Sequence, residues 1–105
     1  MSRSATTSGH LVRLGFHDPR ASLEVLAELG DEVADPLVAL MGRTADPDQA
    51  VAGLLRLARV VDDRGEMLRA VSDDEGTAMR LLSVLGASAA LSDHLVRHPA
   101  HWREL

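Results

Sequence analysis

Apolar residues recur at the spacing of α-helices along most of this chain of 105 residues. The clearest stretch runs from Pro47 to about Val61, where they occupy positions i, i+3, i+4 and i+7 of one helical face: Val51, Leu54, Leu55 and Ala58. The same spacing recurs between about Asp74 and Leu85, at Ala78, Leu81, Leu82 and Leu85. Each pattern predicts a helix with one buried face.

Shorter stretches predict the remaining helices. They cover about residues 19–30, 36–42, 66–71 and 88–97. No segment alternates apolar and polar residues with the β-branched side chains that strands favour. The pattern therefore predicts an all-α fold of five to six short helices in an irregular bundle, with no sheet.

The dipeptide Asp-Pro marks three of the expected helix starts. It occurs at Asp18-Pro19, Asp35-Pro36 and Asp46-Pro47. An aspartate in this position accepts hydrogen bonds from the unpaired N–H groups of the first turn, and proline has a helical φ where no N–H is needed. Gln49, three residues after Asp46, would supply the reciprocal half of a capping box.

Other residues mark where helices end. Gly30 and Gly86 are expected to end the helices before them, because glycine tolerates the geometry of a C-cap. Ser88 is expected to cap a last helix that reaches roughly Arg97. Residues 1–13 are polar, small and without periodicity, which predicts a flexible tail. Residues 14–105 would then form the helical segment.

Composition limits the kind of protein. The net charge is −5, and the 11 basic residues are all arginines scattered among carboxylates, which argues against nucleic-acid binding. Without cysteine there is no disulfide or thiolate chemistry. No stretch approaches the ~20 apolar residues that cross a bilayer, and the N-terminus lacks the apolar core of a secretory signal. We therefore expect a cytoplasmic protein without a membrane partner.

Three histidines near the end of the chain, His94, His98 and His101, raise the question of a metal site. His94 and His98 are one helical turn apart and so share a face. Pro99 cannot donate to the carbonyl of Leu95 and disfavours helical geometry at His98, so we expect His101 to lie off that face. Since no obvious fourth ligand is near, solvent-facing histidines are the better interpretation.

The other polar clusters lack the arrangement of an active site. The acidic runs Asp62-Asp63 and 73–75 flank expected turns and helix starts, where capping and solvation explain them. No serine lies in a G-x-S-x-G motif, and there is no glycine-rich phosphate loop. The sequence thus offers no catalytic, cofactor-binding or metal-binding residue.

Residues 81–105, LLSVLGASAALSDHLVRHPAHWREL, carry the most specific resemblance to a known family. They resemble a stretch near the N-terminus of the bacterial bifunctional glutamine synthetase adenylyltransferase/adenylyl-removing enzymes, where a leucine-rich helix runs into L-G-x-S-x-x-L and then L-x-x-x-P. The matching positions are Leu85, Gly86, Ser88, Leu91, Leu95, Pro99, Trp102 and Leu105. Residues 14–30 and 45–63 are similar to the actinobacterial form, so the resemblance spans about residues 12–105.

The resemblance implies that the chain is the N-terminal helical part of a much longer enzyme, inactive alone. In that family one nucleotidyltransferase domain attaches AMP to glutamine synthetase, and the other removes it by phosphorolysis. ATP and Mg²⁺ are expected at a downstream G-G-x-E-L-x-x-x-S-D-x-D motif, which is absent here. The residues would lead into the adenylyl-removing domain. The implied partners are glutamine synthetase, a PII-type signalling protein and the remainder of the enzyme's own chain.

Two other functions remain open on the sequence alone. A small helical interaction or regulatory module would use its leucine-rich faces to bind a protein partner or to dimerise. A helix-turn-helix DNA-binding protein would place Gly86 in its turn. Its second helix, however, offers only Arg97 as a cation and carries Asp93, whereas DNA recognition calls for basic residues there.

Overall fold

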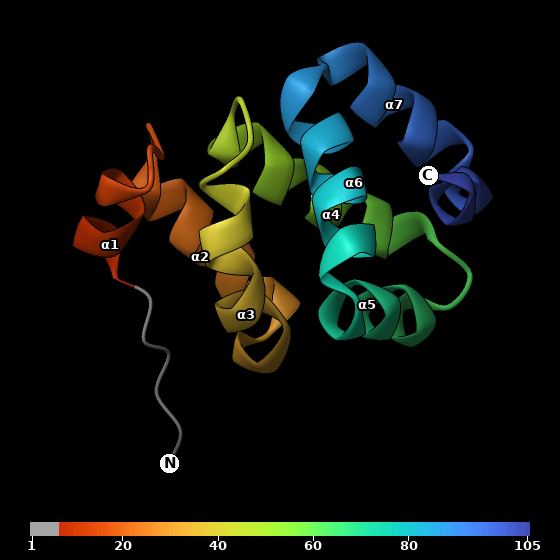
Figure 1. Cartoon of the computed structure of the whole chain (residues 1–105), viewed down its shortest axis with the longest axis horizontal. Helices are drawn as coiled ribbons and strands as arrows, with labels where there is room; N and C mark the ends of the chain where they lie inside the picture. Colours follow the sequence, from red (N-terminus) through yellow and green to blue (C-terminus); the bar gives the residue numbers. More distant parts are fainter. Residues whose placement is uncertain (1–6) are drawn as a thin grey trace.

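Amphipathic helices with capped starts account for most of the structure (Figure 1). The computed structural model describes residues 7–105, without the side chains of residues 31 and 32. Its helices are α1 (Ser8–Arg13), α2 (Pro19–Leu29), α3 (Asp31–Met41), α4 (Pro47–Val60), α5 (Arg64–Asp73), α6 (Glu75–Ala87), α7 (Ala89–Arg97) and the 3-10 helix η1 (Pro99–Glu104). Residues 7–105 contain no β-strand. The all-α prediction is confirmed, while the expected count of five to six helices is too low.

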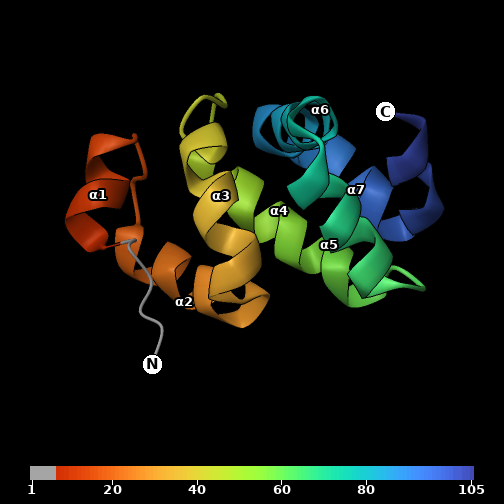
Figure 2. The same cartoon turned by 60° about the horizontal axis from the view of Figure 1, so that its bottom comes forward.

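Helix α4 forms the centre of the fold. It packs most extensively against α6 and next against α2, and it also contacts α5 and α7. Figure 2 shows it running between these helices. The predicted stripe is buried: Val51, Leu54, Leu55 and Ala58. Ala50 and Leu57 are buried as well, because helices cover α4 on more than the one face that the spacing predicted.

No helix in residues 7–105 is long and apolar enough to cross a membrane.

Short polar side chains cap the starts of α2 and of α4 to α7. In α2, α4, α5 and α6 the carboxylate of an aspartate accepts a hydrogen bond from a backbone N–H of the first turn, and these aspartates are Asp18, Asp46, Asp63 and Asp74. The hydroxyl oxygen of Ser88 accepts the corresponding bond in α7. The distance from the accepting oxygen to the nitrogen ranges from 2.9 Å at Asp63 to 3.2 Å at Ser88. The predicted caps at Asp18, Asp46 and Ser88 are confirmed.

Gln49 does not complete the predicted capping box. Its Nε2 instead donates to the carbonyl oxygen of Leu85 in α6, at 2.9 Å. The hydroxyl of Ser92 in α7 donates to the same oxygen at 3.0 Å. Leu85 lies in the last turn of α6, where carbonyls lack a partner within the helix. One carbonyl oxygen therefore joins α4, α6 and α7.

Gly86 lies inside α6, which continues to Ala87, so the prediction that this glycine ends the helix is wrong. A Cβ at position 86 would lie 2.9 Å from the Cβ of Thr44 and 3.1 Å from the carbonyl oxygen of Asp46. Both distances are shorter than ordinary van der Waals contact. The absence of a side chain thus lets α6 approach the segment that precedes α4.

The predicted helix start at Asp35-Pro36 is also wrong, because Pro36 lies within α3. The helix begins after Gly30, whose φ of 98° ends α2 as predicted. Burial explains why the helix tolerates the proline. Four apolar residues at i, i+3, i+4 and i+7 form one buried stripe across it: Ala34, Leu37, Val38 and Met41. Burying each of the larger side chains contributes about 1.5–3 kcal/mol, which together exceeds the ~3 kcal/mol cost of an interior proline.

The predicted tail over residues 1–13 is wrong for its second half. Residues 1–6 lie outside the described residues, but Ser8–Arg13 forms α1, and Thr7 caps it through a bond from the N–H of His10. Leu11 is fully buried, and α1 packs against α2. A helix this short offers too few turns to reveal periodicity in the sequence, so one buried leucine decides its position.

Candidate functional site

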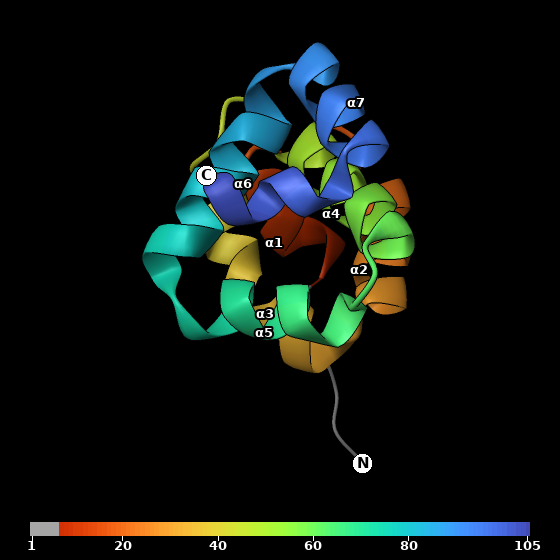
Figure 3. The same ribbon diagram turned by 90° about the vertical axis from the view of Figure 1, so that its right-hand side faces the viewer.

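The C-terminal end of the chain folds back onto the rest of the molecule (Figure 3). Helix α7 ends at Arg97 and Pro99 begins η1, as the proline predicted. Trp102 of η1 is buried, and the guanidinium of Arg103 donates to the carboxylate of Glu66 in α5. This hydrogen bond raises the pKa of Arg103. The buried ring and the ion pair together hold η1 in place.

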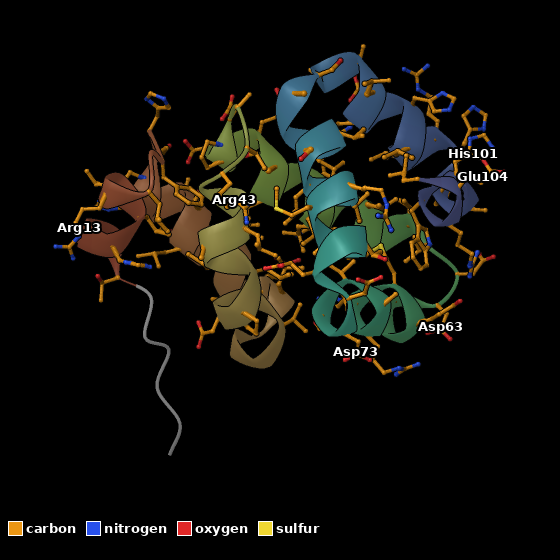
Figure 4. All side chains as sticks on the ribbon, in the orientation of Figure 1. Arg13, Arg43, Asp63, Asp73, His101 and Glu104 are labelled. Atoms are coloured by element: carbon orange, nitrogen blue, oxygen red, sulfur yellow. The ribbon has the colours of Figure 1, made fainter. Side chains whose placement is uncertain are left out.

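The three histidines lie together at this end, and Figure 4 labels His101 beside Glu104. The Nε2 atom of His94 and the Nδ1 atom of His101 are 3.2 Å apart. The ring centroids of His94 and His98 are 4.8 Å apart, and each is 5.3 Å from that of His101. The helix ends before His101, as expected, but η1 turns the chain back and brings the His101 ring against the other two. All three side chains are exposed, as predicted.

The histidines contact one another through their rings and do not surround a position for an ion. The contact between His94 and His101 requires one ring nitrogen to donate and the other to accept a hydrogen bond. Among residues 7–105, no group of three or more histidine, aspartate or glutamate side chains is placed to hold a metal ion. That the chain binds no metal stays a prediction.

Two shallow cavities flank the histidines. The first, of about 310 Å³, lies between η1 and the α4–α5 connection, and Val61, Asp62, His98 and Trp102 contribute to its lining. The second, of about 240 Å³, lies among α6, α7 and η1 and has mainly apolar walls. The first combines one carboxylate with imidazoles in an open position, and the second is suited to contact with apolar groups.

One aspartate of each acidic run caps the start of a helix, as expected from the position of the runs in the sequence. Asp63 accepts the N–H of Glu66, while Asp74 accepts the hydroxyl of Thr77 and the N–H of Gly76. The bond from Thr77, followed by that from Gly76, lowers the pKa of Asp74. Asp62 and Asp73 are exposed. The capping interpretation of these carboxylates is confirmed at Asp63 and Asp74.

Asp48 has a role that its sequence position did not reveal. Its carboxylate accepts the hydroxyl of Ser22 at 2.7 Å and the backbone N–H groups of His17 and Asp18. Burial acts to raise the pKa of Asp48, but these bonds outweigh it and leave the pKa lowered. Ser22 is itself buried. Asp48 thus holds the α1–α2 connection against α4, across a sequence separation that local patterns do not bridge.

The helix-turn-helix interpretation does not fit the geometry of α6 and α7. Only Ser88 separates Ala87, the last residue of α6, from Ala89, the first of α7, whereas that motif uses a turn of about 3–4 residues. Asp93 of α7 pairs with Arg56 of α4 at 2.8 Å. The helix that would have to read DNA therefore carries an acidic residue in an ion pair with the core helix.

Most positions that carry the resemblance have structural roles. Leu85, Leu95 and Trp102 are buried. Ser88 caps α7, and Pro99 starts η1. These features define a small all-α segment, in which the recognisable residues set helix ends and core contacts.

Comparison with known proteins then identifies the family. The bifunctional glutamine synthetase adenylyltransferase/adenylyl-removing enzyme of Streptomyces avermitilis is 48% identical over 109 aligned residues, which cover 98% of this chain. The protein of the same name from Streptomyces coelicolor is 44% identical over 98% of the chain, and that from Mycolicibacterium smegmatis is 42% identical over 89%. No family model and no solved structure matches. The chain belongs to this actinobacterial enzyme family and matches its N-terminal region.

The match is confined to a small part of each relative. The chain spans 11% of the length of the two Streptomyces proteins and 10% of the Mycolicibacterium protein. The comparisons thereby establish the family of these residues, while the activity named for the relatives belongs to proteins about nine times as long.

Proposed function

We propose that this chain acts as the N-terminal helical part of an enzyme that adenylylates and deadenylylates glutamine synthetase. The observation that carries the proposal is identity of 39–48% to relatives that share this one name, over at least 78% of the chain. Identity at this level over almost all the helices supports a common fold and a common place in the enzyme.

Within such an enzyme, these residues would be the helical lead-in to the adenylyl-removing nucleotidyltransferase domain. The catalytic chemistry would lie outside them, with ATP and Mg²⁺ bound to the catalytic domains. Glutamine synthetase and a PII-type protein would be partners of the whole enzyme in the cytoplasm. The capped ends and buried faces described above support a structural role for the segment.

A chimeric enzyme tests the proposal. The stretch of the Streptomyces avermitilis enzyme that aligns with this chain is replaced by the chain, and phosphate-dependent loss of AMP from adenylylated glutamine synthetase is measured. The native enzyme and a variant lacking the stretch are the two references. We expect the chimera to work at close to the native rate and the deletion variant to be impaired. A chimera no faster than the deletion variant would contradict the proposal, as would a deletion variant with full activity.

A further inference from the structure

The mainly apolar cavity among α6, α7 and η1 forms an open groove on the surface. Val84, Leu91, Leu95 and Leu105 contribute its apolar walls, and His94, His101 and Glu104 complete the lining. Leu95 is buried, whereas Leu91 is 48% exposed and Leu105 is 40% exposed. Single exposed leucines are common on protein surfaces, but two on the walls of one groove form an apolar patch.

The groove contrasts with the other exposed apolar positions. In the described residues, Val12 and Val60 are the remaining large apolar side chains of comparable exposure. Val12 lies on α1, at the opposite end of the molecule from the C-terminus (Figure 1), and neither valine contributes to this groove. Leu91 and Leu105 are thus the two exposed large apolar residues that share one groove.

The size of the groove argues against a second copy of the chain as its occupant. A stable interface between two proteins buries roughly 600–1,000 Å² on each partner. Four apolar side chains, of which Leu95 is already buried, offer much less than that. A segment of the same polypeptide needs less area, because covalent linkage gives an effective concentration in the millimolar range.

We propose that the groove is the docking site for polypeptide that follows this region in the family's longer enzymes. The inference rests on the proposed function. Since the chain matches an N-terminal region that is 11% of the relatives' length, nearly all of the remaining enzyme lies on its C-terminal side. An aliphatic or aromatic side chain from that part would pack between Leu91 and Leu105, with the imidazoles of His94 and His101 at its edge.

Thiol labelling measures whether the groove is covered. The chain contains no cysteine, so Leu91→Cys introduces one reporter, and Val12→Cys, at the opposite end, is the matched control. Maleimide labelling at each position is followed by mass spectrometry in the isolated chain and in the Streptomyces avermitilis chimera. Circular dichroism verifies that each variant folds. Because both side chains are exposed in the chain, both variants should be labelled rapidly when it is isolated.

In the chimera we expect labelling of Leu91→Cys to slow by at least about tenfold, equivalent to ~1.4 kcal/mol for opening the contact, while Val12→Cys reacts as before. Equally fast labelling at Leu91→Cys in both proteins overturns the docking site, and equal slowing at both positions does so too. If labelling of Leu91→Cys in the isolated chain slows as its concentration rises, the occupant is a second copy. A protected groove in an inactive chimera would refute the proposed function alone, and an unprotected groove in an active chimera would refute the docking alone.

Discussion

Replacing Gly86 by alanine is expected to destabilise the fold, although alanine is the better helix former. Within a helix, alanine gains about 1 kcal/mol over glycine. Against this, the new Cβ would lie 2.9 Å from the Cβ of Thr44 and 3.1 Å from the carbonyl oxygen of Asp46. Neither atom can rotate away, since one is attached to the backbone and the other belongs to it. Overpacking typically costs about 1–3 kcal/mol, so we expect a net loss of about 1 kcal/mol in the free energy of unfolding.

Thermal and urea unfolding, monitored by circular dichroism, measure this loss. A change of ~1 kcal/mol lowers Tm by roughly 4–8 °C in a domain of this size. Gly9→Ala is the matched control, because Gly9 lies in α1 and a methyl group at this position would meet no atom within 4 Å. That variant should be at least as stable as the wild type. If Gly86→Ala were as stable as Gly9→Ala, the close approach of α6 to residues 44–46 would be refuted.

The remaining predictions concern polar contacts and metals. Asp48→Asn should cost about 1.5–3 kcal/mol at pH 7, as hydrogen bonds to charged groups do. Because folding lowers the pKa of Asp48, the ionised carboxylate stabilises the fold at pH values above the ordinary pKa of 3.8, and this stabilisation is lost as the pH falls through the pKa of the folded state. Parallel pH profiles of the urea midpoints of variant and wild type would contradict this. Ser92→Ala should cost about 1 kcal/mol, since Gln49 still bonds to the carbonyl of Leu85, and a urea midpoint equal to that of the wild type would argue against the bond. EDTA should leave Tm unchanged, and a drop in Tm would reveal a bound metal.

Local signals predict the central helices well. The spacing of Val51, Leu54 and Leu55 places α4, and each of these residues is buried. Asp18 and Asp46 mark helix starts because an N-cap needs only a side chain and an N–H three residues away. Periodicity and capping act within one or two turns, so a single sequence contains all of the information they require.

Features that depend on distant segments are not predictable in the same way. Pro36 has the local signature of a helix start, but the buried stripe across it continues α3. Gly86 has the local signature of a helix end, but it lies within α6, where the missing side chain leaves room for the side chain of Thr44. These errors share a physical cause, namely that packing between segments overrides a local preference worth a few kcal/mol.

The candidate site shows the same division. Pro99 correctly predicts the end of α7. The contact between the rings of His94 and His101 is not predictable from their spacing in the sequence, because it depends on the path of η1. The buried Trp102 and the hydrogen bond from Arg103 to Glu66 fix that path against the rest of the fold. The groove beside them depends on how three elements meet, and no spacing within one helix predicts it.

We propose that these residues work as part of a much longer enzyme, and the mass of the native polypeptide decides whether they do. This mass is measured in extracts of the source cells with an antibody raised against the chain. We expect a polypeptide about nine times as long as the chain, as in the relatives of which it spans 11%. Detection only at 11.3 kDa, the mass of the chain itself, would contradict the claim.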